Sequence, residues 1–441
     1  MKNDGCAMLI ARVKLWGKSI GAVSWDERAG LAHFEYETEF INSGIEVAPF
    51  TMPLSKQIYS FPALPRETFH GLPGLLADSL PDDFGNALIN VWLANQGRSP
   101  ETFNPVERLC YTGIRGMGAL EYLPSQGSFT GKSESVDVKA LVELASNILT
   151  KRNALQDSFT PELREDSLQD ILRVGTSAGG ARAKAIIAWN QKTNEVRSGQ
   201  VKTEKGFSYW LLKFDGVSGN KDKELEDPKG YGLIEHAYYH MAKKARIDME
   251  ESRLLKENGR SHFMTRRFDR TASGQKIHMQ SFCAMEHFDF KQAGAHSYEQ
   301  ALRTIRKLGM PMSVIEEQFR RMAFNIIGRN QDDHVKNIAF LMDKSGRWSL
   351  SPAFDMTYSY NPQGDWTGRH QMSLNGKRDD FTIDDFKVCA KNISMKRGRA
   401  EEIVRQVQEA ILQWQNFADE SGVPSEVAER ITKAHRTDIL K

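Results

Sequence analysis

A polar cluster set between two apolar segments constrains this chain more than any other feature. Residues 313–327 have the apolar spacing of a buried helix, which ends just before the cluster. The cluster is Asn330-Gln331-Asp332-Asp333-His334-Val335-Lys336-Asn337. Residues 338–350 predict a β-hairpin, and Asp355 follows that hairpin. The order of helix, polar loop, hairpin and carboxylate predicts that Asp332, Asn337 and Asp355 serve one site.

The side chains in this order are those that phosphoryl transfer needs. A carboxylate can orient an attacking hydroxyl and take its proton, while an amide oxygen and a second carboxylate can complete the oxygen shell of Mg²⁺. An Asp, four residues, an Asn, a hairpin and an Asp also repeat the logic of the protein-kinase catalytic and metal loops. We assign Asp332 as the catalytic base and Asn337 and Asp355 as metal ligands. The alternative for a single Asp is a turn or helix-capping role.

A cation and a loop that bind phosphate are expected upstream. Lys213 lies in the apolar strand predicted over 210–214, where a charge has little structural reason to be unless it points into a site. Its alternative is a side chain that snorkels from a half-exposed strand. Glu235, in the helix predicted after this strand, is the candidate ion-pair partner of Lys213, or it pairs with a solvent-exposed lysine. The glycine-rich turn over 175–180 can bring backbone N–H groups close to phosphate oxygens, although it matches neither a Walker A loop nor G-x-G-x-x-G.

The order of these motifs resembles that of the HipA family of bacterial serine/threonine kinases, the toxins of type II toxin–antitoxin pairs. The residues that carry the resemblance are Ser-x-x-Gly-Ala-x-x-Lys at 177–184, Lys213, Arg267-Phe268-Asp269-Arg270, Asp332-x-His334-x-Lys336-Asn337 and Asp355. Leu80-Pro81-Asp82 and residues 113–120 are similar to the N-terminal subdomain of that family. The resemblance covers essentially the whole chain.

The resemblance implies an ATP- and Mg-dependent serine/threonine-protein kinase, not specific for one protein, that autophosphorylation on a loop serine inactivates. That serine is Ser177, with Thr176 beside it as an alternative acceptor. A phosphate dianion on Ser177 would repel the phosphates of ATP. The residues implied in ATP binding are Ser177, Ala178, Gly179, Gly180, Ala181, Lys213, Arg267, Phe268, His334 and Lys336. Arg266 stands where some relatives carry Glu, which puts a side-chain contact to adenine in doubt.

His334 has no second His or Cys at metal-ligand spacing, so we expect it to orient the catalytic loop. The family resemblance further implies a helix-turn-helix antitoxin of the HipB type, operator DNA bound by the joint complex, and protein substrates that include aminoacyl-tRNA synthetases. A formal charge of +2 from 59 basic and 57 acidic residues does not predict DNA binding. A local basic patch is therefore needed, and its candidates are Lys387, Lys391, Lys396, Arg397 and Arg399, unless these form a solvated face.

The sequence gives no sign of a signal peptide or of an apolar stretch as long as a membrane span. The four cysteines lie far apart without C-x-x-C spacing, so we expect neither a zinc site nor a disulfide framework. These features predict a cytoplasmic protein without a membrane partner.

The length of 441 residues predicts two or three domains. We predict an N-terminal HipA-type subdomain over 1–123, an ATP-binding N-lobe with the glycine-rich loop over 138–270, and a helical C-lobe with the catalytic and metal loops over 271–441. The predicted fold is α+β, a two-lobed protein-kinase-like (HipA-like) fold with a small β-rich N-terminal subdomain and a helical C-terminal lobe. Within the C-lobe, periodicity predicts helices over 400–417 and 423–434.

Three local signals complete the sequence prediction. Short β-rich runs over 7–36 predict a small antiparallel sheet, and Pro81-Asp82-Asp83 predicts the start of a helix. Asn258-Gly259 is a hairpin turn signal.

Two other functions use the same residues. Small-molecule phosphotransferases share the Asp-to-Asn spacing in their H-x-D-x-x-x-x-N loops, and phosphate appearing on a small alcohol would favour that alternative. A catalytically weak, DNA-associated co-repressor that acts with its antitoxin would keep the fold without turnover. The complete set of core residues favours the protein kinase.

Overall fold

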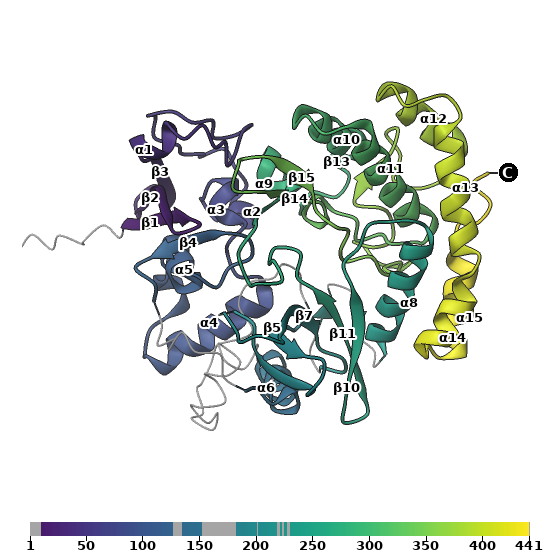
Figure 1. Ribbon diagram of the computed structural model, residues 1–441, viewed down its shortest axis with the longest axis horizontal. Helices are drawn as coiled ribbons and strands as arrows, with labels where there is room; N and C mark the ends of the chain where they lie inside the picture. Colours follow the sequence, from purple (N-terminus) through teal and green to yellow (C-terminus); the bar gives the residue numbers. More distant parts are fainter. Residues whose placement is uncertain are drawn as a thin grey trace, which may run out of the picture. The chain divides into compact units, whose positions relative to one another are not determined.

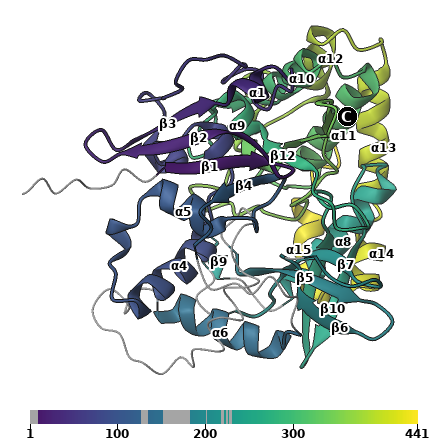
Figure 2. The same ribbon diagram turned by 60° about the vertical axis from the view of Figure 1, so that its left-hand side comes forward.

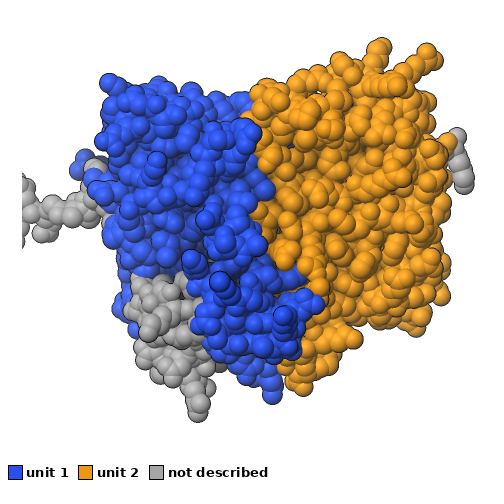
Figure 3. Space-filling model, viewed as in Figure 1, with its two compact units in different colours: residues 1–211, 269–287, 341–347 blue, residues 212–268, 288–340, 348–441 orange. Residues whose placement is uncertain are grey.

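The computed structural model describes residues 10–126, 135–151, 182–200, 202–217, 221–222, 225–226 and 230–440. The chain divides into two compact units (Figure 3). Unit 1 comprises residues 1–211, 269–287 and 341–347, and unit 2 comprises residues 212–268, 288–340 and 348–441. The domain boundaries expected from the sequence stay a prediction. Among the described residues, no helix combines the length and the apolar character that a membrane span requires.

Unit 1 contains the small antiparallel sheet that the N-terminal sequence predicts. Its strands are β1 (Ile10–Leu15), β2 (Lys18–Asp26), β3 (Leu31–Tyr36) and β4 (Leu120–Leu123), in the order β3-β2-β1-β4 (Figure 2). In the central strand β1, Val13 lies opposite Gly21 on one side and Tyr122 on the other. The turn between β1 and β2 uses Trp16 at φ 50° and Gly17 at φ 81°, the left-handed pair that tight hairpins favour.

The remaining elements of unit 1 include a helix whose start the sequence predicts correctly. They are α1 (Thr38–Ile41), α2 (Arg66–Phe69), α3 (Gly74–Ala77), α4 (Asp83–Asn95), α5 (Pro105–Thr112), α6 (Val138–Lys151), α9 (Phe282–Glu286), β5 (Lys184–Asn190), β6 (Glu195–Ser198) and β12 (His278–Ser281). Asp82 caps α4, because its carboxylate accepts a hydrogen bond of 2.7 Å from the backbone N–H of Gly85. The same buried carboxylate lies 3.1 Å from Nζ of Lys184.

Among the described residues, unit 2 carries most of the longer α-helices (Figure 1). Its elements are α8 (Tyr231–Lys244), α10 (Tyr298–Lys307), α11 (Met312–Ile327), α12 (Ile383–Asn392), α13 (Arg399–Ile411), α14 (Trp414–Ser421), α15 (Ser425–Ala434), β8 (Lys221–Asp222), β9 (Leu225–Glu226), β10 (Ser252–Glu257), β11 (Arg260–Arg266), β13 (His296–Ser297), β15 (Trp348–Leu350) and β16 (Met372–Ser373). The unit boundary falls within β7 (Ser208–Lys213) and β14 (Ala339–Met342). Asn258 at φ 43° and Gly259 at φ 75° form the predicted turn of the β10–β11 hairpin.

The C-terminal helices surround a buried aromatic contact. Helix α8 packs against α14, where the rings of Tyr238 and Trp414 meet edge to face with centroids 5.2 Å apart. The single helix expected over 400–417 is wrong, because the chain leaves helical geometry at Gln413 between α13 and α14. This break allows the buried Trp414 to donate its indole N–H to the carbonyl of Ala428 at 3.0 Å.

The close packing of α8 on β11 gives a test of this core. A Cβ on Gly232 would lie 2.5 Å from the carbonyl oxygen of Ser261 and 3.1 Å from the nitrogen of Phe263. Alanine is ordinarily the better helix former, yet overpacking of this kind costs about 1–3 kcal/mol. We expect Gly232→Ala to lower the urea midpoint of unfolding. Gly116→Ala is the control, since its Cβ would meet only the Thr112 methyl at 3.3 Å, and equal stability of the two variants would contradict the packing.

Candidate active site

The polar cluster folds into a short loop closed by its own amide side chain. Asn337 ends a 3₁₀ turn over Val335–Asn337, and its backbone N–H bonds to the carbonyl of His334 at 2.9 Å. Its side-chain Nδ2 donates to the carbonyl of Asp332 at 2.8 Å. Because the amide nitrogen is engaged in this way, Oδ1 is the atom through which Asn337 can coordinate a cation. The Asp332 carboxylate beside it is 31% exposed and thus accessible to a substrate.

Lys213 is buried and held by two carboxylates. It ends β7, and its Nζ lies 2.5 Å from Oε1 of Glu235 on α8. The same Nζ donates to Oδ1 of Asp355. The side chains of Lys213 and Glu235 are 9% and 2% exposed, so Lys213 does not snorkel to solvent. The structure therefore brings together three of the residues that the sequence selected.

Asp355 has a left-handed backbone, with φ 53°, which is costly for a residue other than glycine. Asn330 holds it there, because its Nδ2 donates to the carbonyl of Asp355 at 3.1 Å and to Oδ1 of Asn325 at 3.0 Å. Ser359 Oγ in turn donates to Oδ1 of Asn330 at 3.2 Å. The start of the polar loop is thereby tied to the segment that carries the second candidate metal ligand.

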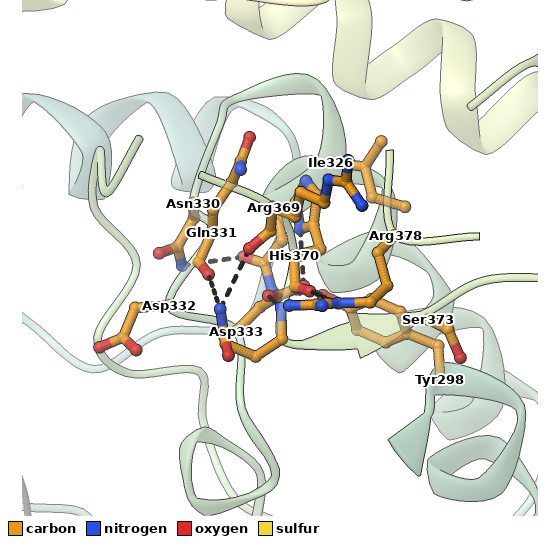
Figure 4. Close-up of polar contacts among 12 residues, drawn as sticks. Tyr298, Ile326, Asn330, Gln331, Asp332, Asp333, Arg369, His370, Ser373 and Arg378 are labelled. Carbon is orange, nitrogen blue, oxygen red and sulfur yellow. Dashed lines mark hydrogen bonds and ion pairs between the residues drawn. The ribbon is translucent and has the colours of Figure 1, made fainter. Parts of the chain in front are cut away.

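Asp333 ties the catalytic loop to Tyr298 and to the segment around His370 (Figure 4). Its fully buried carboxylate accepts hydrogen bonds from Tyr298 Oη at 2.5 Å, His370 Nδ1 at 2.7 Å and the backbone N–H of Gln371 at 2.7 Å. Burial alone would raise the pKa of Asp333, but His370 and the other donors outweigh it, so the pKa lies below its ordinary value. The neighbouring Asp332 points away from this cluster in Figure 4.

The partners of His370 determine its tautomer. Arg436 Nη1 lies 2.9 Å from His370 Nε2, and a guanidinium can only donate. Nε2 is therefore the acceptor, and Nδ1 carries the proton that it donates to Asp333. Burial lowers the pKa of Arg436 to about 10, so this guanidinium remains charged at neutral pH. Arg436 is fixed in turn by the carbonyl of Ile326 at 3.1 Å and by Asp379.

Other residues selected from the sequence lie around the loop. His334 Nε2 is 3.8 Å from Oδ1 of Asp332, and Lys336 Nζ is 4.4 Å from the ring of Phe290. Arg267 is buried, and the ring of Phe268 lies 5.6 Å from that of Phe354. Ser177, Ala178, Gly179, Gly180 and Ala181 lie outside the described residues, as does Thr176.

The candidate basic patch, which lies within residues 387–399, is partly neutralised by neighbouring acidic side chains. Lys387 lies 3.1 Å from Asp384, and Arg399 lies 2.9 Å from both Glu316 and Glu402. The side chains of Lys391, Lys396 and Arg397 are exposed.

Among the described residues, no group of three His, Cys, Asp or Glu side chains could hold a metal ion.

Sequence reasoning gave Asp333 no role and missed its supports. These are the donors Tyr298, His370 and Gln371, and Arg436, which holds His370. Sequence reasoning also missed Trp366, which donates to Asp332. His370 is 37 positions from Asp333 along the chain, and Arg436 is a further 66 positions away. The one local signal was a second Asp directly after the candidate base, since adjacent acids in a loop need separate environments.

Comparisons with known proteins agree on one family. A family model described as the HipA-like C-terminal domain matches residues 176–415, and one described as the HipA N-terminal domain matches residues 11–123. A solved structure of HipA, HipB and operator DNA from Shewanella oneidensis MR-1 has a chain with a TM-score of 0.63 and 15% identity, with 98% of this chain and 96% of that chain covered. This likeness confirms the predicted HipA-like α+β fold.

A second solved structure is less similar. The proinflammatory kinase CtkA of Helicobacter pylori has a TM-score of 0.31 and 13% identity, with 52% of this chain and 90% of that chain covered. Comparison with curated proteins gave no match.

The Asp333 contacts predict a stability effect that depends on pH. Asp333→Asn replaces an acceptor-only group by one that presents an N–H to donors, which should cost about 3–5 kcal/mol at pH 7. Because the folded-state pKa lies below the ordinary value of 3.8, the contribution of Asp333 is present above that value and is lost as the pH falls through the folded-state pKa.

The measurement is chemical denaturation of both proteins from pH 7 down to pH 3. We expect the stability difference to be large at pH 7 and to shrink toward pH 3. Asp384→Asn is the control, because that carboxylate is 80% exposed and should change stability little. A constant difference across this range would contradict a charged Asp333.

Proposed function

The chain belongs to the HipA family, and from this premise we propose that it is an ATP- and Mg²⁺-dependent serine/threonine-protein kinase, the toxin of a type II toxin–antitoxin pair. The reaction transfers the γ-phosphoryl group of ATP to a hydroxyl of a protein serine or threonine, with ADP as the leaving group. The family match covers residues 176–415 and 11–123, which include all the proposed site residues.

The pairing of buried Lys213 with both Glu235 and Asp355 is the observation that carries this proposal. A lysine in a dry site needs partners, and here they come from a helix and from the segment after the hairpin. Phosphoryl-transfer sites need this combination, because a cation must face phosphate oxygens while a nearby carboxylate holds the metal. The outer of the two carboxylates, on Asp355, is 29% exposed, so a ligand can reach it.

The loop residues then take distinct roles in the proposed reaction. Asp332 accepts the proton of the attacking hydroxyl, and its partial exposure suits a group that meets a protein substrate. Asn337 Oδ1 and the Asp355 carboxylate are the oxygen donors for Mg²⁺, which commonly takes one or two protein carboxylates and completes its shell with water and phosphate. When bound, Mg²⁺ supplies charge neutralisation at the phosphates.

We further propose the nucleotide contacts and the self-limiting step that the family resemblance implies. Lys213, Arg267, Phe268, His334 and Lys336 contact ATP, with the glycine-rich loop at 177–181. Ser177 is the autophosphorylated residue, and its phosphate lowers ATP affinity by charge repulsion. The partners we propose are a HipB-type antitoxin and operator DNA, supported by the likeness to the Shewanella oneidensis MR-1 complex. The cellular protein substrate is proposed only as a class, a protein that presents a serine or threonine.

Autophosphorylation provides the direct test. Purified chain, first treated with a phosphatase, is incubated with Mg²⁺ and ATP and then analysed by intact mass and by site mapping. We expect one phosphate on Ser177, because the family resemblance implies that this loop serine is the acceptor. Asp332→Asn should reduce the rate by about 10²–10⁴-fold, since it removes the proposed general base.

Controls separate catalysis from folding in this test. Binding of a fluorescent ATP analogue should persist in Asp332→Asn, because Asp332 is not a proposed nucleotide contact. Phosphate that appears equally in Asp332→Asn, or none in a wild-type protein that binds ATP, would refute the proposed kinase. Transfer to a small alcohol, with none to protein, would point to a small-molecule phosphotransferase.

A further inference from the structure

The proposed base already has a hydrogen-bond donor on one of its two oxygens. Trp366 donates its indole N–H to Oδ1 of Asp332 at 2.6 Å. An indole can donate but not accept, so Oδ1 of Asp332 is the acceptor in this contact. His334 Nε2 lies 3.8 Å from the same oxygen. Among the described residues, Oδ2 of Asp332 has no such contact, and it is the oxygen that can face a substrate hydroxyl.

The segment that carries Trp366 is fastened to the catalytic loop along its length. Gln331 Nε2 donates to the carbonyl of Thr367 at 3.1 Å. Gln371 Nε2 donates to the carbonyls of Trp366 and Arg369, in the second case at 3.0 Å, and its backbone N–H bonds to Asp333 at 2.7 Å. The indole is thus presented to Asp332 from a backbone that is itself held in place.

The buried end of this segment has the firmest support. Figure 4 shows His370 gathered with Asp333 and Tyr298, on the other side of the loop from Asp332. His370 is fully buried, and its Nδ1 lies 2.7 Å from Asp333. Residues 366–371 therefore run from an anchored end at His370 to a half-buried end at Trp366. An anchored segment of this length can hold a side chain at a defined distance from its target.

We propose that Trp366 is a positioning residue for the proposed reaction, which holds Asp332 so that Oδ2 faces the attacking hydroxyl. The inference rests on the proposed function, because it concerns the residue proposed as general base. An aspartate fixed at one oxygen loses less rotational freedom when the hydroxyl arrives, and general-base catalysis depends on this geometry. Trp366 acts through Asp332 and has no contact with the reacting atoms.

The indole N–H of Trp366 differs in setting from that of a structural tryptophan in the same unit. Trp414 is fully buried and donates to the backbone carbonyl of Ala428 at 3.0 Å, which satisfies a buried polar group. Trp366 is only half-buried and donates to a carboxylate. Trp414→Phe is therefore a matched control that removes an indole hydrogen bond away from Asp332.

The test compares full-length wild type, Trp366→Phe, Trp366→His and Trp414→Phe by the initial rate of Ser177 autophosphorylation as ATP is varied with Mg²⁺. We expect Trp366→Phe to lower the rate at saturating ATP by about 10- to 100-fold, the effect of a small misplacement of a catalytic group. The half-saturating ATP concentration should stay within twofold. Trp366→His, which keeps a ring N–H, should recover part of the rate.

Each outcome decides the question. The positioning role is supported if Trp366→Phe loses rate, Trp366→His recovers part of that rate, and Trp414→Phe keeps the wild-type rate. An unchanged or faster Trp366→Phe overturns it, as does a histidine variant no better than phenylalanine. Equal loss of rate, ATP binding and thermal stability in Trp366→Phe shows a merely structural tryptophan and also overturns it. A wild type without phosphoryl transfer would instead refute the proposed function.

Discussion

A carboxylate removed from water must be given donors by the protein, and the buried Asp333 is the group on which the catalytic loop depends. It takes one donor from α10, through Tyr298, and two from the segment at His370 and Gln371. Those donors come from two segments that also pair with each other through β13 and β16. This strand pairing and the buried charge together fix the loop that holds Asp332 and the segment that holds Trp366.

Lys213 is also a buried charge that needs partners, and it is held by two carboxylates. Its charge is shared between the carboxylates of Glu235 and Asp355. Such an arrangement is a poor source of stability, because desolvation of buried charges offsets most of their attraction. The arrangement suits a site that binds both a cation and an anionic ligand. The cation can contact the carboxylates, and the anionic ligand can contact the lysine.

The sequence was sufficient where a local pattern determines the outcome. Asn258-Gly259 requires a left-handed turn, and Asp82 caps α4 by a contact three residues away. The closure of the loop by Asn337 is also local, since it reaches back five residues to Asp332, but from the sequence Asn337 is interpreted only as a metal ligand. The sequence was insufficient where tertiary packing decides. The break between α13 and α14 follows from the burial of Trp414, and Trp366 reaches Asp332 across 34 positions.

The two buried networks differ in how far they open to solvent. Asp333 is joined through His370 to Arg436, and Asp379 lies between Arg436 and Arg329, which is 3.8 Å from it. The side chain of Asp333 is 1% exposed, whereas that of Asp355, which contacts Lys213, is 29% exposed. A ligand can therefore reach the Lys213 cluster at Asp355, while the Asp333 network holds the loop that carries Asp332.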